Sequence, residues 1–294
     1  MFLSDMCTVS GNRGEGRGYA KVNLTLDVTG KRPDGYHDIL TVMRTVNLYD
    51  TVTAELTQAP GIELTTSLDW LPVDSKNIAW RAARLLLDKA GADAGVKLHI
   101  DKRIPCGAGM GGGSADGAAV LALLNRLLGG PLGEKQLLEL GAEIGADVPF
   151  CLMCGTALAS GIGEKLESLT VNGTVPVLVV KPEVSVSTPE MYRIIDECEV
   201  FRRPDTDTML KALEAGNLQG IADALCNIME PPATDIHPVI GEIRSQMLEN
   251  GALGAMMTGS GSAVFGIFPT VEAADACSIL FYGKYNDVFS TILL

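Results

Sequence analysis

The residues of this sequence best suited to chemistry lie in one glycine-rich stretch, residues 107–114. Five glycines fall within seven positions, and Ser114 and a long apolar run follow them. Because glycine has no Cβ, the backbone N–H groups of such a loop can turn outward and approach a ligand closely. We expect Ser114 to cap the following helix and Asp116 to lie in its first turn, where the helix dipole favours an acid. A loop of free N–H groups that leads into a helix binds anions, so we interpret this stretch as holding the phosphates of a nucleotide.

The better-known phosphate-binding loops do not fit this stretch. A Walker A loop ends in Gly-Lys-Ser or Gly-Lys-Thr, and no lysine precedes Ser114. Gly107, Gly109 and Gly112 match G-x-G-x-x-G, but a dinucleotide-binding unit also needs a second strand that ends in an acid about 20 residues later. A second helix-like stretch, residues 134–144, stands there instead. A flexible surface loop is the weaker alternative, because a proline and a long apolar run flank the glycines.

The amino-acid composition and net charge of the chain limit the kinds of molecule that it is expected to bind. The chain has 294 residues, of which 47% are apolar, and a formal net charge of −13. The negative charge disfavours nucleic acid and anionic membrane surfaces, so we expect a small-molecule substrate. No apolar run reaches about 18 residues, the length that a membrane span needs, and no hydrophobic signal region is seen. We therefore expect a cytoplasmic protein without a membrane partner.

The seven cysteines and three histidines do not suggest a metal centre. An odd number of cysteines in mostly apolar surroundings favours reduced thiols. Cys151 and Cys154 form a C-x-x-C pair, but no second pair or nearby histidine follows. We interpret this pair as part of a packed strand and not as a metal site.

Polar side chains at three other places could serve a site. Alternation in an early strand puts Lys21 and Asn23 on the same face. A Pro-Asp-Gly turn presents Tyr36 and His37 side by side, an aromatic and a hydrogen-bonding ring suited to a flat ligand. Asp147 lies in a turn that follows a helix. Each place also has an ordinary structural alternative: a solvated strand face, a packed tyrosine beside an exposed histidine, and a helix-terminal acid.

Hydrophobic periodicity predicts the elements that must position these residues. We expect strands over residues 19–28, 44–56, 95–101, 150–160, 175–181, 252–257, 263–268 and 287–294. We expect helices over residues 77–89, 118–128, 134–144, 207–215, 218–229, 237–250 and 273–282. Residues 1–17 are polar and glycine-rich, and we expect them to be poorly ordered. The mixture of helices and antiparallel strands indicates an α+β fold, with one domain over residues 1–165 and a second over residues 166–294.

Three motifs taken together resemble the plan of the GHMP kinase superfamily. They are Ala-Lys-Val-Asn at residues 20–23, Pro-x3-Gly-Met-Gly-Gly-Gly-Ser at 105–114 and Thr-Gly-Ser-Gly-Ser at 258–262. Two further segments resemble motifs of one branch of this superfamily: Asp-Gly-Tyr-His at 34–37 and Gly-Ala-Asp-Val-Pro at 145–149. That branch phosphorylates the C2 hydroxyl of a cytidine-diphosphate-linked methylerythritol in the non-mevalonate route to isoprenoid precursors. The resemblance extends over nearly the whole chain.

The resemblance implies a two-domain kinase, with an N-terminal ribosomal-protein-S5-like α/β domain and a C-terminal ferredoxin-like α+β domain. It implies that Asp147 is the general base that takes the proton of the acceptor hydroxyl. Lys21 would lower the barrier by its charge, and Asn23 would position the substrate. These roles suit phosphoryl transfer, which needs in-line positioning and neutralised oxygen charge more than covalent help.

The resemblance also implies binding residues for both substrates. Tyr36 and His37 would contact the cytidine end, Tyr192 would sandwich the cytosine, and Thr188 would touch the substrate. The glycine loop would hold the ATP phosphates, and Asn77 and Lys102 would line the adenine side. The loop residues with this implied role are Pro105, Gly107, Ala108, Gly109, Met110, Gly111, Gly112, Gly113 and Ser114. The late loop that would close on the diphosphate comprises Gly259, Ser260 and Gly261.

ATP is thus the expected cofactor, with Mg²⁺ partly coordinated by water and Ser114 as a candidate ligand. The sequence departs from the pattern at Tyr19, where the family often has proline, and at Asp116, where some members have asparagine. One alternative is a GHMP kinase for another acceptor, such as homoserine, mevalonate or a sugar. Another is a nucleotide-binding protein without catalysis, which the presence of Lys21 and Asp147 disfavours. A monomer and a homodimer are both compatible with the sequence.

Overall fold

The computed structural model describes residue 3, residues 7–200 and residues 202–294. Its contacts divide the chain into two compact units whose segments alternate along the sequence. The first unit holds residues up to 20, 48–106 and 111–154, and the second holds 21–47, 107–110 and 155–294. The long strands β2 (Arg13–Lys31) and β3 (His37–Thr57) therefore contribute residues to both units.

The first unit contains a sheet with one covered face. Its strands follow the order β1 (Thr8–Ser10), β2, β3, β5 (Gly95–Asp101) and β4 (Ile62–Thr66). In this unit β4 and β5 pair in parallel, whereas β1 with β2 and β3 with β5 pair antiparallel. Along β5, Val96, Leu98 and Ile100 are buried while the residues between them are exposed. This alternation is typical of a strand with one face on a core and the other in solvent.

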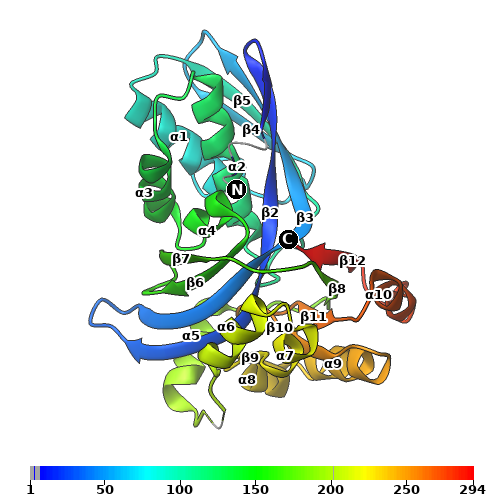
Figure 1. Cartoon of the computed structure of the whole chain (residues 1–294). Helices are drawn as coiled ribbons and strands as arrows, with labels where there is room; N and C mark the ends of the chain where they lie inside the picture. Colours follow the sequence, from blue (N-terminus) through cyan, green and yellow to red (C-terminus); the bar gives the residue numbers. More distant parts are fainter. Residues whose placement is uncertain (1–2, 4–6, 201) are drawn as a thin grey trace. The chain divides into compact units, whose positions relative to one another are not determined.

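Four helices cover that buried face (Figure 1). They are α1 (Ile78–Ala90), α2 (Gly112–Leu127), α3 (Glu134–Ile144) and α4 (Val148–Met153). The central helix is α2, whose residues are all buried from Ala115 to Asn125. A Cβ on Gly117 would lie 2.7 Å from Cγ2 of Ile78, so glycine here permits the close packing of α2 on α1.

The second unit contains a βαββαβ arrangement. Its strands are β8 (Val175–Lys181), β10 (Gly254–Met257), β11 (Val264–Ile267) and β12 (Asp287–Leu293). They pair antiparallel in the order β10, β11, β8, β12. This connectivity and mixture of helices and strands confirm the predicted ferredoxin-like α+β domain.

Helices connect these strands, and short strands extend the sheet. Between β8 and β10 the chain forms α5 (Thr188–Glu197), α6 (Thr206–Glu214), α7 (Leu218–Asp223), α8 (Glu230–Ile236) and α9 (Val239–Glu249). The helix α10 (Val271–Ser278) lies between β11 and β12 in sequence. The short strands are β6 (Thr156–Ser160), β7 (Lys165–Leu169) and β9 (Cys226–Asn227). No helix among the described residues is long and apolar enough to span a membrane.

Several predicted elements are confirmed to the residue. The strands predicted at 95–101 and 175–181 and the helix predicted at 134–144 have the observed bounds. The glycine hairpin is also confirmed, because β10 and β11 pair antiparallel on either side of residues 258–263. These elements have strong local patterns and turn residues at their ends.

The expectation of a poorly ordered start is wrong for the described residues after Cys7. Thr8–Ser10 forms β1 and pairs with β2, which begins at Arg13. A Cβ on Gly18 would lie 2.4 Å from the carbonyl oxygen of Ala115. This glycine permits close approach of β2 to α2 and does not mark flexible filler. Residues 1–2 and 4–6 of the same predicted segment lie outside the described residues.

The predicted cap of the phosphate-loop helix is also wrong. Gly111, with φ of 70°, is the N-cap, and α2 begins at Gly112. Ser114 is therefore inside the helix, and Asp116 is buried beyond the first turn. Glycine adopts this left-handed backbone without the Cβ clash of other residues, which lets the helix begin earlier than a serine cap predicts.

Two further predictions overextended an element. Residues 150–153 belong to α4, so the strand predicted at 150–160 is reduced to Thr156–Ser160. Pro149 stands in the first turn of α4, a position that suits its fixed φ and missing N–H. The helix predicted at 218–229 ends at Asp223, and the chain continues through β9 into α8.

Candidate active site

In the second unit, Lys21 and Asn23 are joined by a hydrogen bond on the same face of β2. Lys21 Nζ donates to Asn23 Oδ1 at 2.7 Å, and Asn23 Nδ2 donates to Thr41 Oγ1 at 2.8 Å. All three side chains are buried. The structural alternative of a solvated strand face is therefore wrong, and the lysine ammonium has a defined orientation. Thr41 was missed by sequence reasoning, which had no signal for the pairing of β2 with β3.

Residues 107–110 pack against the late glycine loop within this unit. The backbone of Asn23 donates to Thr258 Oγ1 at 3.0 Å, and the backbone of Lys21 donates to the carbonyl of Met110 at 3.0 Å. A Cβ on Gly109 would lie 2.2 Å from the carbonyl oxygen of Thr258. The structure thus brings together the strand, the first half of the phosphate loop and the late loop, as their combination in one site requires.

Asn227 holds the late loop by hydrogen bonds to its backbone. Sequence reasoning also missed this residue. Its Nδ2 donates to the carbonyl oxygens of Met257 at 2.9 Å and Gly259 at 2.8 Å. Its Oδ1 accepts from the backbone N–H of Met229 at 3.0 Å. An amide that uses both of its groups in this way ties β9 to the end of β10.

A group of aromatic and charged side chains lies at the far end of β2 and β3. His37 is buried and stacks on Tyr192, with ring centroids 4.6 Å apart and an angle of 11° between the planes. His37 Nε2 lies 2.8 Å from Asp196 Oδ1, and Lys31 Nζ donates to Asp196 Oδ2 at 2.6 Å. His37 is thus not the exposed side chain of the structural alternative. Tyr36, in contrast, is 61% exposed.

Thr188 is close to the late loop. Its Oγ1 lies 2.7 Å from Oγ of Ser260, and it begins α5 after the cap residue Ser187. Because either hydroxyl can donate, the pair can rotate to serve a ligand oxygen. Two residues predicted from different motifs are therefore neighbours in this unit.

In the first unit, the second half of the phosphate loop becomes the N-terminus of α2. The N–H groups of Gly112, Gly113 and Ser114 lie in its first turn, where no carbonyl of the helix itself can accept from them. Gly113 is exposed. These donors and the helix dipole suit an anion such as a phosphate.

Lys102 lies next to Gly112 at the start of α2, in a buried cluster of charged side chains. Its Nζ donates to Asp116 Oδ2 at 2.7 Å and to Asp50 Oδ2. Asp50 Oδ1 accepts from the backbone N–H groups of Arg103 at 2.6 Å and Ile104 at 2.8 Å. The cluster therefore connects the end of β5 to the body of α2, and Asp50 was missed by sequence reasoning.

Burial and charge act together on the pKa values of this cluster. Burial raises the pKa of Asp116 well above its ordinary value; Lys102 opposes that rise and the neighbouring Asp50 adds to it. Burial acts to lower the pKa of Lys102, but the two carboxylates together raise it. Lys102 thus stays protonated, and Asp116 holds a proton more tightly than an exposed aspartate does.

The other predicted residues of the first unit have defined surroundings. Asn77 caps α1: its Oδ1 accepts from Ala79 N at 2.9 Å and its Nδ2 donates to the carbonyl of Pro72 at 2.8 Å. Asp147 is half-buried and occupies the N-cap position of α4, with a backbone φ of −82°. It is thus an acid at a helix start, whereas the structural alternative was an acid at a helix end.

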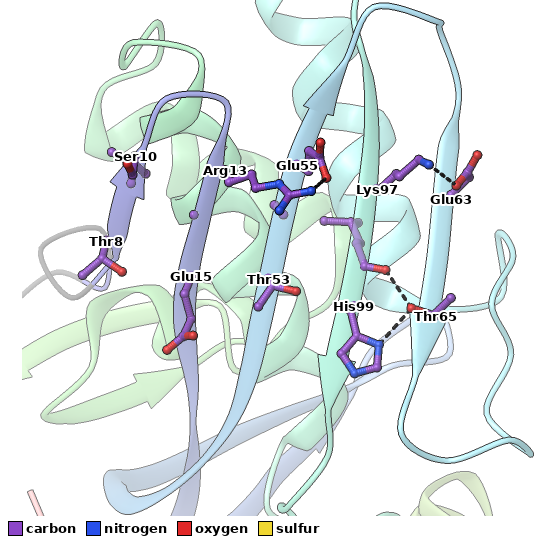
Figure 2. Close-up of a pocket in the computed structure, with 14 residues that line it drawn as sticks. Thr8, Ser10, Arg13, Glu15, Thr53, Glu55, Glu63, Thr65, Lys97 and His99 are labelled. Carbon is purple, nitrogen blue, oxygen red and sulfur yellow. Dashed lines mark hydrogen bonds and ion pairs between the residues drawn. The ribbon is translucent and has the colours of Figure 1, made fainter.

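A hollow of about 660 Å³ in the first unit contains none of the predicted site residues. It lies on the open face of the sheet, where side chains of β1 to β5 project outward (Figure 2). Two ion pairs lie in it at the surface: Arg13 with Glu55 at 2.7 Å and Lys97 with Glu63 at 3.4 Å. Exposed ion pairs of this kind contribute little to the stability of the fold, and they indicate a solvated sheet face.

Comparison with known proteins gives two family matches. Residues 77–155 match the model of the GHMP kinases N terminal domain, and residues 209–283 match that of the GHMP kinases C terminal. A 4-diphosphocytidyl-2-C-methyl-D-erythritol kinase from Caldicellulosiruptor saccharolyticus is 49% identical over 267 residues, which cover 90% of this chain and 92% of the relative.

Solved structures agree with these matches. A crystal structure of 4-(cytidine 5'-diphospho)-2C-methyl-D-erythritol kinase superposes with a TM-score of 0.81 at 34% identity and covers 95% of this chain and 98% of its own. A homoserine kinase from Cytophaga hutchinsonii superposes with a TM-score of 0.75 at 20% identity, covering 97% of this chain and 95% of its own, and so shares the fold alone. The chain therefore belongs to the GHMP kinases and, among them, to the family of 4-diphosphocytidyl-2-C-methyl-D-erythritol kinases.

Proposed function

We propose that this enzyme transfers the γ-phosphate of ATP to the C2 hydroxyl of 4-diphosphocytidyl-2-C-methyl-D-erythritol. The products are the 2-phosphate of that compound and ADP, a step of non-mevalonate isoprenoid precursor synthesis. The observation that carries the choice of acceptor is the stacked pair His37 and Tyr192 beside the exposed Tyr36. Aromatic faces of this kind suit a flat base such as cytosine, and an acceptor without a base would make no use of them.

Asp147 is the proposed general base of this reaction. A carboxylate within reach of the acceptor hydroxyl can take its proton as the oxygen attacks the γ-phosphorus. The bond from phosphorus to the β–γ bridging oxygen breaks, and ADP leaves with the electron pair. Lys21, oriented by Asn23, supplies positive charge for the oxygens of the transferred group.

The ATP phosphates are proposed to lie on residues 107–114, at the first turn of α2. The turn fits an anion because its N–H groups lack helical partners and Gly111 has a positive φ. Pro105 leads into this segment, and Asn77 and Lys102 are proposed for the adenine side. Gly259, Ser260 and Gly261 are proposed to close on the diphosphate, with Thr188 contacting the substrate.

Mg²⁺ is proposed to enter with ATP. Among the residues that the structure describes, no three His, Cys, Asp or Glu side chains form a group that could hold a metal ion. The hydroxyl of Ser114 in the first turn of α2 suits Mg²⁺, which keeps several waters and binds through phosphates and one or two protein oxygens. Ser114 is the proposed protein ligand, and the ion would neutralise phosphate charge.

We also propose a cytoplasmic enzyme with domains over residues 1–165 and 166–294. The two family models support this boundary, since one match ends before it and the other begins after it. The assembly is proposed to be a monomer or a homodimer, which sedimentation velocity would decide.

A coupled ADP-release assay with Mg-ATP tests the proposed function. The acceptors are 4-diphosphocytidyl-2-C-methyl-D-erythritol, the same polyol phosphate without the cytidyl group, homoserine, mevalonate and none. We expect turnover with the cytidyl compound alone. Turnover with homoserine or mevalonate instead would overturn the choice of acceptor and leave a GHMP kinase of another specificity.

A further inference from the structure

We propose that Thr41 is a positioning residue that aims the Lys21 ammonium through the side chain of Asn23. The proposal rests on the proposed function of Lys21. It concerns a buried hydroxyl that lies two side chains away from that lysine and carries no assigned role. Thr41 is on β3, and Lys21 and Asn23 are on β2.

The direction of each hydrogen bond in this chain follows from chemistry alone. An ammonium can only donate, so the amide oxygen of Asn23 must face Lys21, at 2.7 Å. The amide nitrogen then faces Thr41 Oγ1, at 2.8 Å, and can only donate to it. The Thr41 hydroxyl donates to the carbonyl oxygen of Thr25, at 2.5 Å, because a carbonyl oxygen can only accept. A rotated amide would place its NH2 group against the ammonium, so the chain has a single direction.

Burial makes this chain sensitive to the loss of one member. Lys21, Asn23, Thr25 and Thr41 are at most 5% exposed. Without the Thr41 hydroxyl, the Asn23 amide nitrogen loses a partner that water cannot easily replace. A buried donor in that state costs free energy until the side chain turns elsewhere. Any such turn moves Oδ1, to which Lys21 donates, and displaces the ammonium.

The sheet itself offers a matched control. Thr156 is also a buried threonine, and its hydroxyl has no hydrogen-bond partner among the residues that the structure describes. It lies on β6, the neighbour of β3, where Thr156 pairs with Arg44 and Ala159 pairs with Thr41. Thr156→Val therefore makes the same chemical change in the same pair of strands without breaking a hydrogen bond.

The test compares kcat and KM of five variants: Thr41→Val, Thr41→Ser, Thr156→Val, Lys21→Met and the combination of Lys21→Met with Thr41→Val. We expect Thr41→Val to lower kcat about 10-fold, the effect of one charge-linked hydrogen bond, with KM for ATP changed less than about 2-fold. Thr41→Ser, which keeps the hydroxyl, and Thr156→Val should each stay within about 3-fold of wild type. In a Lys21→Met background, Thr41→Val should lower kcat further by less than about 2-fold, because it acts through the missing lysine.

Two results would overturn the proposal. One is a wild-type kcat for Thr41→Val, and the other is the same loss of kcat with and without Lys21. The kinetic cycle uses whichever acceptor the wild-type enzyme turns over, so a wrong acceptor overturns the proposed function and leaves this test intact. The side-chain amide signals of Asn23 in NMR spectra need no acceptor. They should shift in Thr41→Val and stay in place in Thr156→Val, and unchanged signals in Thr41→Val would also contradict the proposal.

Discussion

Two buried lysines, one in each unit, make different hydrogen bonds. Lys102 in the first unit lies between the carboxylates of Asp50 and Asp116. Lys21 in the second unit donates to the neutral amide of Asn23. The carboxylates hold the Lys102 ammonium by charge, and the Asn23 amide fixes the direction of the Lys21 ammonium. The comparison teaches that burial alone does not mark a catalytic lysine; the chemistry of its acceptors distinguishes a structural role from a catalytic one.

The largest effect is expected at Lys102. Lys102→Met would leave two carboxylates buried together, so we expect a loss of about 3–5 kcal/mol in the free energy of unfolding. Urea denaturation measures it, with Lys97→Met at an exposed lysine as the control. In the fraction that stays folded, kcat should remain within about 3-fold of wild type. KM for ATP should rise as well, because Lys102 is also proposed for the adenine side. Unchanged stability would show that the buried cluster does not stabilise the fold.

Lys21→Met provides the other half of the comparison. We expect kcat to fall about 100-fold, because charge on the transferred phosphoryl group loses its stabilisation. The free energy of unfolding should change by less than about 1 kcal/mol, much less than for Lys102→Met. Steady-state kinetics and urea denaturation on the same preparation separate the two lysines. A large loss of stability with unchanged kcat would make Lys21 structural.

Asp147→Asn tests the acid that Lys21 is proposed to assist. We expect kcat to fall about 100-fold or more with ATP binding retained, because an amide cannot accept the hydroxyl proton. Rapid-quench measurement of ADP formation and ATP titration by fluorescence report the two properties. Asp101→Asn, at an exposed aspartate of the same unit, is the control. A kcat near that of wild type would exclude Asp147 as the base.

The pH dependence of stability sharpens the description of the Lys102 cluster. The pKa of Asp116 is raised in the folded protein, so the folded state binds this proton more tightly than the unfolded state. Below the ordinary pKa of aspartate this proton adds full stability, and the gain is lost as pH rises through the raised pKa. Asp116→Asn cannot ionise. As pH rises, the wild-type protein should therefore lose stability relative to this variant. The total loss is about 1.4 kcal/mol for each pH unit by which folding raises the pKa of Asp116. Urea denaturation of both proteins between about pH 4 and 8 measures this difference. A difference that does not change with pH would contradict it.

The smallest expected effect concerns the cytidine end. Tyr36→Ala should raise KM for the cytidyl substrate about 5-fold and leave KM for ATP unchanged, since one stacked aromatic face contributes about 1 kcal/mol. Tyr282→Ala is the control, because Tyr282 is 58% exposed and Tyr36 is 61% exposed. An equal rise of both KM values would contradict the cytidine assignment.

The sequence by itself determined the features that depend on neighbouring residues. Alternation predicted β5, an apolar run predicted β8, helical periodicity predicted α3, and the glycines of residues 107–113 preceded a predicted helix. These patterns are local because side-chain direction and backbone freedom repeat within a few residues. The motif resemblance added the family, which the relatives then showed.

The tertiary structure alone decided which polar groups meet. Thr41 contacts Asn23 across 18 residues, Asn227 contacts Met257 across 30, and Lys102 contacts Asp50 across 52. It also decided that Gly18 serves the close packing of β2 on α2. Each of these contacts depends on strand register and on helix packing against the sheet. No local pattern encodes them, because the partner of a buried polar group is set by what the folded chain places opposite it.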